Sequence, residues 1–258
     1  MSAREIVRLM NEEEVKVTRA LKLAEEGIAK AIERAAAAYM AGGRIIYVGA
    51  GTSGRIATMD AAEMPPTFGT DPSRFVALIA GGAGADGKAI ENAEDDVHAA
   101  VTALNQLKLN ANDIVIGIAA SGTTPYVVSA VGHARQKGVW TCGIANNRNA
   151  PLLSAADLGI LLDTGPEVLT GSTRLNAGTS QKLTLNRIST GAMVLSGKVI
   201  ENLMVDVKAS NAKLKDRCAR IVCELSPVTR DEAWEMLEAH NWNIRAVLDS
   251  LKAPAAVV

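Results

Sequence analysis

Residues 44–54 read RIIYVGAGTSG and contain the pattern that decides the fold. A short apolar run, typical of a buried strand, leads directly into Gly49, Gly51 and Gly54, which match G-x-G-x-x-G. Glycines at this spacing allow a tight turn from a strand into a helix and let a phosphate approach the backbone. The pattern alone leaves open whether the ligand is a dinucleotide or another phosphate.

Four further runs of the same kind follow along the chain: FVALIA (75–80), DIVIGIA (113–119), VWTCGIA (139–145) and LGILL (158–162). Helical stretches separate most of them, and the runs are almost continuously apolar, as in a parallel sheet covered on both faces. We therefore predict an α/β fold with a doubly wound, five-stranded parallel sheet.

Helical patterns flank this sheet. Apolar residues recur every three or four positions from Val17 to Gly42, which predicts one N-terminal helix. After Thr170 we expect no further strands, only long helices, and such helices often pack against another subunit. Thr229 and Glu232 form a capping-box pair that opens a small helical module. Its expected core residues are Trp234, Met236, Leu237, Trp242, Ile244, Val247 and Leu248.

The chain is thus predicted to have three parts. Residues 1–43 form an N-terminal helical segment, and residues 44–224 form the sheet domain with dimerisation helices. Residues 225–258 form the small helical (UBA-like) module.

Composition excludes several classes of protein. The 27 Lys and Arg residues nearly balance 28 Asp and Glu, so the chain lacks the basic excess that nucleic-acid binding needs. No apolar run is long enough to cross a membrane, and the polar N-terminus is unlike a secretory signal, so we expect a cytoplasmic protein. The cysteines and histidines lack metal-ligand or disulfide spacing and are expected to be ordinary residues: Cys142, Cys218, Cys223, His98, His133 and His240.

The second strand argues against a dinucleotide. It ends IAGGAG, without the carboxylate that would hold a ribose, and Asp71 precedes the strand instead. The third strand leads into a second loop of Ser and Thr residues ahead of Pro125, where hydroxyls and helix N-terminal amides can bind an anion. The two loops therefore predict a sugar-phosphate site made by Gly51, Thr52, Ser53, Gly54, Ser121, Gly122, Thr123 and Thr124.

The chain resembles the N-acetylmuramic acid 6-phosphate etherases, which are sugar isomerase (SIS) domain proteins. The resemblance covers nearly the whole chain in the family's order, and its main motifs are GAGTSGR (49–55), EMPPTFG (63–69), AEDD (93–96), GIAASGTTPYV (117–127) and GPEVLTGSTRLNAGTSQKL (165–183). It implies a cytoplasmic, homodimeric carbon–oxygen lyase of the hydro-lyase class that needs no cofactor or metal. Its substrate would be a phosphorylated amino sugar from peptidoglycan recycling, from which it removes D-lactate to leave N-acetylglucosamine 6-phosphate.

The resemblance also assigns two catalytic carboxylates. Glu94 would remove the C2 proton of the open-chain sugar, and Glu63 would protonate the departing lactate and then activate water. One group must be ionised while the other is protonated, so their environments must separate their pKa values. Glu91, three residues before Glu94 and so on the same face of a helix, is a rival to Glu94 for its role.

Two departures from the family pattern keep alternatives open. Thr123 and Asn176 stand where the family usually has Arg and Lys. A phosphosugar-binding regulator without turnover is one alternative, and a phosphosugar isomerase is another.

Overall fold

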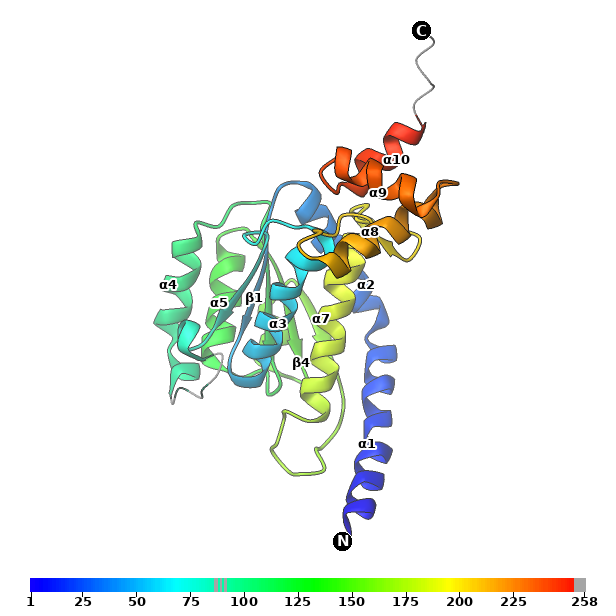
Figure 1. Ribbon diagram of the computed structural model, residues 1–258. Coiled ribbons are helices and arrows are strands. Elements are labelled where there is room, and N and C mark those ends of the chain that lie inside the picture. The colour runs from blue at the N-terminus through cyan, green and yellow to red at the C-terminus, as the bar shows by residue number, and fades with distance from the viewer. Residues whose placement is uncertain (86–87, 89, 91, 253–258) are drawn as a thin grey trace. The chain divides into compact units, whose positions relative to one another are not determined.

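The computed structural model describes residues 1–85, 88, 90 and 92–252, and it shows an α/β fold (Figure 1). Residue contacts divide the chain into two units. The first contains Met1–Ala62 and Pro72–Ala192, and the second contains Glu63–Asp71 and Met193–Val258. Each unit has its own apolar core.

The first unit is built on a five-stranded parallel sheet in the order β2-β1-β3-β4-β5. The five predicted strands are confirmed, with ends shifted by one residue: β1 (Ile45–Gly49), β2 (Phe75–Ile79), β3 (Ile114–Ala119), β4 (Trp140–Ala145) and β5 (Leu158–Leu161). Every residue of β1 and β3 is buried, which explains why these runs are continuously apolar.

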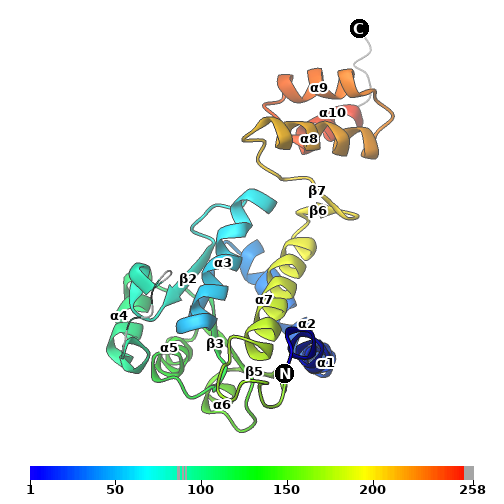
Figure 2. The same cartoon turned by 60° about the horizontal axis from the view of Figure 1, so that its bottom comes forward.

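Helices cover both faces of this sheet (Figures 1 and 2). Ile46 and Val115 point into a core shared with α4 (Val97–Leu107), α5 (Pro125–Gln136) and α6 (Pro151–Ala155). Tyr47 faces the opposite side, where it meets α3 (Gly51–Phe68). This second face is also covered by α2 (Glu25–Met40) and α7 (Asn176–Leu195).

From the order of the strands, a ligand-binding crevice is expected at the carboxyl ends of β1 and β3. β2 lies on one side of β1, whereas β3, β4 and β5 follow on the other. The helices after β1 and β3, α3 and α5, cover opposite faces of the sheet. Open α/β sheets bind ligands where the direction of strand order reverses in this way.

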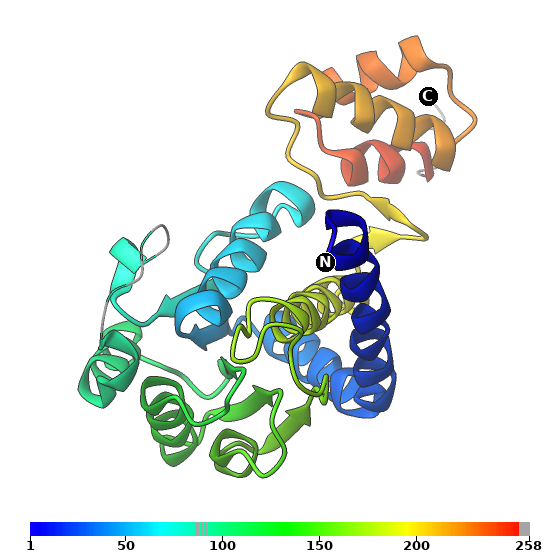
Figure 3. The same ribbon diagram turned by 90° about the horizontal axis from the view of Figure 1, so that it is seen from below.

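The N-terminal segment differs from the single helix expected from Val17. It forms two helices, α1 (Ala3–Leu23) and α2, with a break at Ala24 (Figure 3). Ser2 and Glu5 form a capping box that starts α1 well before Val17. The expected boundary was wrong, because the buried positions of α1 begin only at Val17 whereas the helix begins at Ala3.

The described part of the second unit contains the ends of α3 and α7, a short hairpin and three complete helices. β6 (Val199–Ile200) pairs antiparallel with β7 (Leu203–Met204), so the expectation of no strand after Thr170 was wrong. Two-residue strands are too short to show a periodic pattern. α8 (Ala212–Leu225), α9 (Arg230–Ala239) and α10 (Ile244–Lys252) share one apolar core. Of the seven core residues predicted for the small module, four are buried in this core, and Trp234, Met236 and Trp242 are half-buried against it.

None of the helices within the described ranges is long and apolar enough to cross a membrane.

Candidate active site

The glycine-rich turn between β1 and α3 is as tight as the sequence predicts. A Cβ atom at Gly49 would lie 2.7 Å from the backbone nitrogen of Gly54, and one at Gly54 would lie 2.5 Å from Ile79. Gly51 starts α3 with a φ of +52°, in the left-handed region that favours glycine. Thr52 is half-buried and lies close to Gly178 on α7. A Cβ atom added at Gly178 would lie 3.5 Å from the methyl carbon of Thr52.

The loop between β3 and α5 lies next to this turn, since β1 and β3 are hydrogen-bonded neighbours. Ser121 accepts hydrogen bonds from the backbone N–H and the hydroxyl of Thr123, at 3.2 and 3.0 Å. Gly122 has a φ of +67°, and a Cβ there would lie 2.3 Å from that of Ala150. Thr124 is the N-cap of α5 but makes no side-chain capping bond, so its hydroxyl does not serve the helix.

Glu94 lines a cavity of about 200 Å³ together with residues of the first loop. The cavity is bordered by Ala50 and Gly51 at the end of β1, and by Arg55 and Lys88. Among the described residues that line it, two side chains are cationic and one is a carboxylate, a balance that suits an anionic ligand. Glu94 itself is exposed and lies in a 3-10 turn, Ala93–Asp95, rather than on the longer helix considered from the sequence. Glu91 lies outside the described residues.

Glu63 belongs to the second unit and lies near the end of α3, with an exposed side chain. Pro65 and Pro66 lie inside this helix, which continues to Phe68. Because proline has no N–H, these residues cannot donate to the carbonyls of Ala61 and Ala62. The helix therefore lacks two of its ordinary hydrogen bonds, and both of them would span Glu63.

Ser53 is buried rather than open to the crevice. It is 7% exposed, and its hydroxyl donates a 2.8 Å hydrogen bond to Oε1 of Gln181 on α7. Gln181 in turn donates to Asn146, whose amide donates to Ser180 and to the carbonyl of Leu162. This chain of polar contacts joins the glycine-rich turn, the end of β4 and the start of α7.

Asp60, on α3 one turn before Glu63, is the centre of a second buried polar cluster. Its carboxylate accepts hydrogen bonds from Tyr47 (2.9 Å), Asn186 (2.7 Å) and Ser189 (3.0 Å). Burial raises the pKa of Asp60, while the three hydrogen bonds and the charge of Lys182 oppose the rise. Burial and the charge of Asp60 raise the pKa of Tyr47 well above its usual value.

A third polar contact fixes the start of α7. Both oxygens of Glu167 accept hydrogen bonds from backbone N–H groups, at Asn176 and Ala177, each at 2.9 Å. A carboxylate at a helix N-terminus is stabilised by the helix dipole. The side chain of Asn176 is 5% exposed, and its buried amide nitrogen has no hydrogen-bond partner among the described residues.

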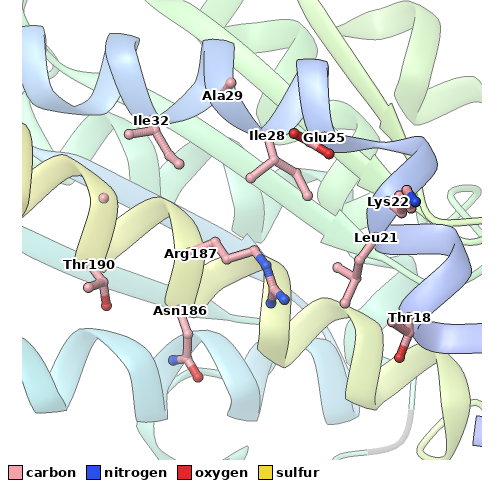
Figure 4. Close-up of a pocket in the computed structure, with 11 residues that line it drawn as sticks. Thr18, Leu21, Lys22, Glu25, Ile28, Ala29, Ile32, Asn186, Arg187 and Thr190 are labelled. Carbon is pink, nitrogen blue, oxygen red and sulfur yellow. The ribbon is translucent and has the colours of Figure 1, made fainter.

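A larger cavity, of about 720 Å³, lies away from these loops between α1, α2 and α7 (Figure 4). Leu21 and Ile28 approach it from one side, and Asn186, Arg187 and Thr190 approach it from α7. Its lining is mainly apolar and carries neither predicted catalytic carboxylate.

The cysteines and histidines play no visible part in these sites. The three cysteines are free thiols, and burial raises the pKa of Cys142. Within the described ranges, no group of three or more His, Cys, Asp or Glu side chains is placed to hold a metal ion.

The sequence prediction missed several residues of this region. Arg55 directly follows the glycine pattern and could have been noted as a cation beside the loop. The partner of Ser53 and two of the three partners of Asp60 lie on α7, more than a hundred residues away in the sequence, and no local signal identifies them.

Comparison with known proteins gives matches along the whole chain. Residues 27–135 match the glucokinase regulatory protein N-terminal SIS domain, and residues 90–186 match the SIS domain. The N-acetylmuramic acid 6-phosphate etherase of Geobacillus thermodenitrificans is 50% identical, over 96% of this chain and 84% of that protein. The enzyme of the same name from Lactobacillus acidophilus is 46% identical, over 98% of this chain and 85% of that protein.

Solved structures share the fold at low identity. A phosphoheptose isomerase from Neisseria gonorrhoeae has a TM-score of 0.57 at 21% identity, covering 76% of this chain and all of that one. The Vibrio vulnificus NanR protein complexed with ManNAc-6P has a TM-score of 0.54 at 17% identity, covering 88% of this chain and 72% of that one.

Proposed function

This chain belongs to the N-acetylmuramic acid 6-phosphate etherase family, and we propose that Glu94 and Glu63 supply the base and the acid of its reaction. It is a carbon–oxygen lyase that cleaves the D-lactyl ether of N-acetylmuramic acid 6-phosphate, giving N-acetylglucosamine 6-phosphate and D-lactate. The observation that carries the assignment of Glu94 is its place in the cavity beside the glycine-rich turn, together with two cationic side chains.

The first half of the proposed reaction is an elimination. In the open-chain sugar, the C1 aldehyde acidifies the proton on C2, and the carboxylate of Glu94 takes that proton. The electron pair forms a double bond between C2 and C3 while the bond from C3 to the lactyl oxygen breaks. The carboxylic acid of Glu63 gives its proton to that oxygen, and D-lactate leaves.

The second half adds water to the unsaturated aldehyde. Glu63, now ionised, takes a proton from water as the water oxygen bonds to C3. Glu94 returns its proton to C2, so both groups regain their starting states. The overall reaction uses one water molecule per ether cleaved and needs no oxidant, reductant or cofactor.

The loops after β1 and β3 are the proposed phosphate site. Ser121, Thr123 and Thr124 offer hydroxyls at the start of α5, whose dipole favours an anion. Gly51 and Thr52 border the crevice from the other side. The hydroxyl proton of Ser53 is engaged with Gln181, so Ser53 would contribute through its backbone N–H.

Release of D-lactate from N-acetylmuramic acid 6-phosphate tests this function directly. We expect Glu94→Gln and Glu63→Gln to lower kcat by at least about a hundredfold, the usual scale for loss of a general acid or base. Asp95→Asn and Glu235→Gln are matched controls on exposed acids, and both should retain turnover. Full activity in Glu94→Gln would remove its role as the base.

The same assay separates the alternatives. Aldose–ketose conversion without lactate would identify an isomerase. Stabilisation by sugar phosphates without any product would identify a binding protein, the alternative that Thr123 and Asn176 raise.

We also propose a homodimer in which the apolar groove between α1, α2 and α7 is covered by a second copy (Figure 4). Several large apolar side chains on α1 are exposed, among them Ile6 (45%), Val7 (57%) and Met10 (39%). Exposed apolar stripes of this kind mark association surfaces. In sedimentation experiments, Val7→Glu with Met10→Glu should give monomers, whereas Val97→Glu should leave the wild-type mass unchanged.

Cytoplasmic location is proposed from the phosphorylated substrate and from the free thiols, which fit a reducing compartment. Fractionation of cells should recover the lactate-releasing activity in the cytosolic fraction.

A further inference from the structure

A separate cavity of about 680 Å³ lies entirely within the second unit. Its walls come from the chain between β7 and α8, from the turn between α9 and α10, and from the residues around Gly69 and Lys198. A Cβ at Gly69 would lie 2.3 Å from the carbonyl oxygen of Asp206, so the segment that carries Glu63 packs closely against this wall. None of the predicted catalytic or phosphate-binding residues lines the cavity.

The described walls of this cavity carry more cationic than anionic side chains. Among the described residues that line it, Lys198, Lys208 and Arg245 are cationic, and Asp206 supplies the single carboxylate. The ammonium of Lys198 lies 2.8 Å from Oδ2 of Asp206, and the guanidinium of Arg245 is paired with Oδ1. One carboxylate thus neutralises one of three cations, which leaves two positive charges in excess in a concave space. We call these four residues the basic cluster.

Two of the three cations of the basic cluster, Lys198 and Arg245, are held in place by the protein. Arg245 donates hydrogen bonds to Asp206 and to the carbonyl of Gly197, and its side chain remains 39% exposed. Lys198 is fixed by Asp206 and remains 25% exposed. Side chains that are ordered before binding lose less conformational entropy when a ligand arrives. Both can therefore contact a ligand while keeping their contacts to Asp206.

The backbone beside the basic cluster also favours an anion. Ile244 and Arg245 form the first turn of α10, where N–H groups lack partners within the helix and the dipole is positive. Asn241 and Trp242 precede it with φ values of 51° and 61°. Two consecutive non-glycine residues in the left-handed region are strained, and such strain concentrates at binding sites.

We propose that the basic cluster binds a small phosphorylated metabolite at a site distinct from the loops after β1 and β3. A phosphate group can accept hydrogen bonds from a guanidinium and two ammonium groups at once, which satisfies the excess charge. The cavity has the volume of a small-molecule site. The chain carries a formal net charge of −1, so its surface does not offer the broad basic field that would attract nucleic acid instead.

Fluorine NMR on protein labelled with 5-fluorotryptophan can detect this binding, with inorganic phosphate and glucose 6-phosphate as the probes. Of the three tryptophans, Trp242 lines the cavity, Trp234 contacts Trp242, and Trp140 lies at the amino end of β4 in the first unit. At constant ionic strength in potassium chloride, each probe should shift the Trp242 signal saturably. The Trp140 signal serves as the internal reference and should not move.

Charge variants then test which groups bind the probe. Lys208→Gln replaces the ammonium group of an exposed side chain with a neutral amide. Because one charged contact is lost, Kd should rise about three- to tenfold. Lys213→Gln makes the same change on α8 outside the cavity and should leave Kd unchanged. Lys198→Gln provides a second variant, with circular dichroism to confirm that the helices remain folded. No saturable shift of Trp242, or equal binding by the Lys208 and Lys213 variants, would overturn the proposal.

Discussion

The hydroxyl of Ser53 donates a 2.8 Å hydrogen bond to Oε1 of Gln181, so the glycine-rich turn and α7 share a buried polar contact. In Ser53→Ala, the Gln181 oxygen would lose its donor. A buried acceptor without a partner costs about 1–3 kcal/mol, so we expect a clear fall in Tm. Ser121 is only half-buried and accepts from its own loop, so Ser121→Ala should raise KM with little change in Tm.

Thermal unfolding and steady-state kinetics on the two serine variants check this division of roles. A Ser53→Ala protein with wild-type Tm and a raised KM would mean that Ser53 acts on the substrate and not through Gln181.

Gly122 and Gly51 both have positive φ values, +67° and +52°, but only Gly122 is crowded. An alanine at Gly51 meets nothing within 4 Å, so it should cost only the strain of the left-handed conformation, about 1–2 kcal/mol. An alanine at Gly122 would collide with Ala150 as well, which adds about 1–3 kcal/mol of overpacking. Urea unfolding of both variants should therefore show the larger loss for Gly122→Ala. Equal losses would mean that the chain around Ala150 moves aside freely.

Lys88 lines the cavity that contains Glu94 and supplies positive charge for an anionic substrate. Lys88→Gln should raise KM for N-acetylmuramic acid 6-phosphate about threefold or more, and the effect should shrink as salt screens the charge. Lys137→Gln, the same change at the end of α5, is the matched control and should behave as wild type. A fall in kcat with an unchanged KM would place the Lys88 charge at the transition state instead.

The sequence predicted the sheet well because its strands are short, apolar and buried on both faces, which is a local signal. The two loops predicted to bind phosphate follow β1 and β3, which are hydrogen-bonded neighbours, so both loops begin at the same edge of the sheet. The contacts of Asp60 were beyond prediction, because Asn186 and Ser189 lie 126 and 129 residues away and each reads locally as a polar helix residue. The 3-10 turn around Glu94 was missed because it is short: three residues are too few to show a helical repeat in the sequence.

Asp60 is the group for which the structure predicts a distinct dependence of stability on pH. Burial raises the pKa of this carboxyl above its ordinary value of 3.8, against the hydrogen bonds from Asn186, Tyr47 and Ser189 and the charge of Lys182. A carboxyl with a higher pKa in the folded state stabilises the protein fully below the unfolded pKa, and this contribution is lost as pH rises through the folded pKa. The side chain introduced by Asp60→Asn does not titrate, so the variant provides the reference. The quantity to follow is the free energy of unfolding of the wild type minus that of the variant. This difference should decrease from about pH 4 upward and then level off. Urea unfolding of both proteins at closely spaced pH values measures this difference directly. A difference that grows with pH would show that the hydrogen bonds to the ionised carboxylate outweigh its burial.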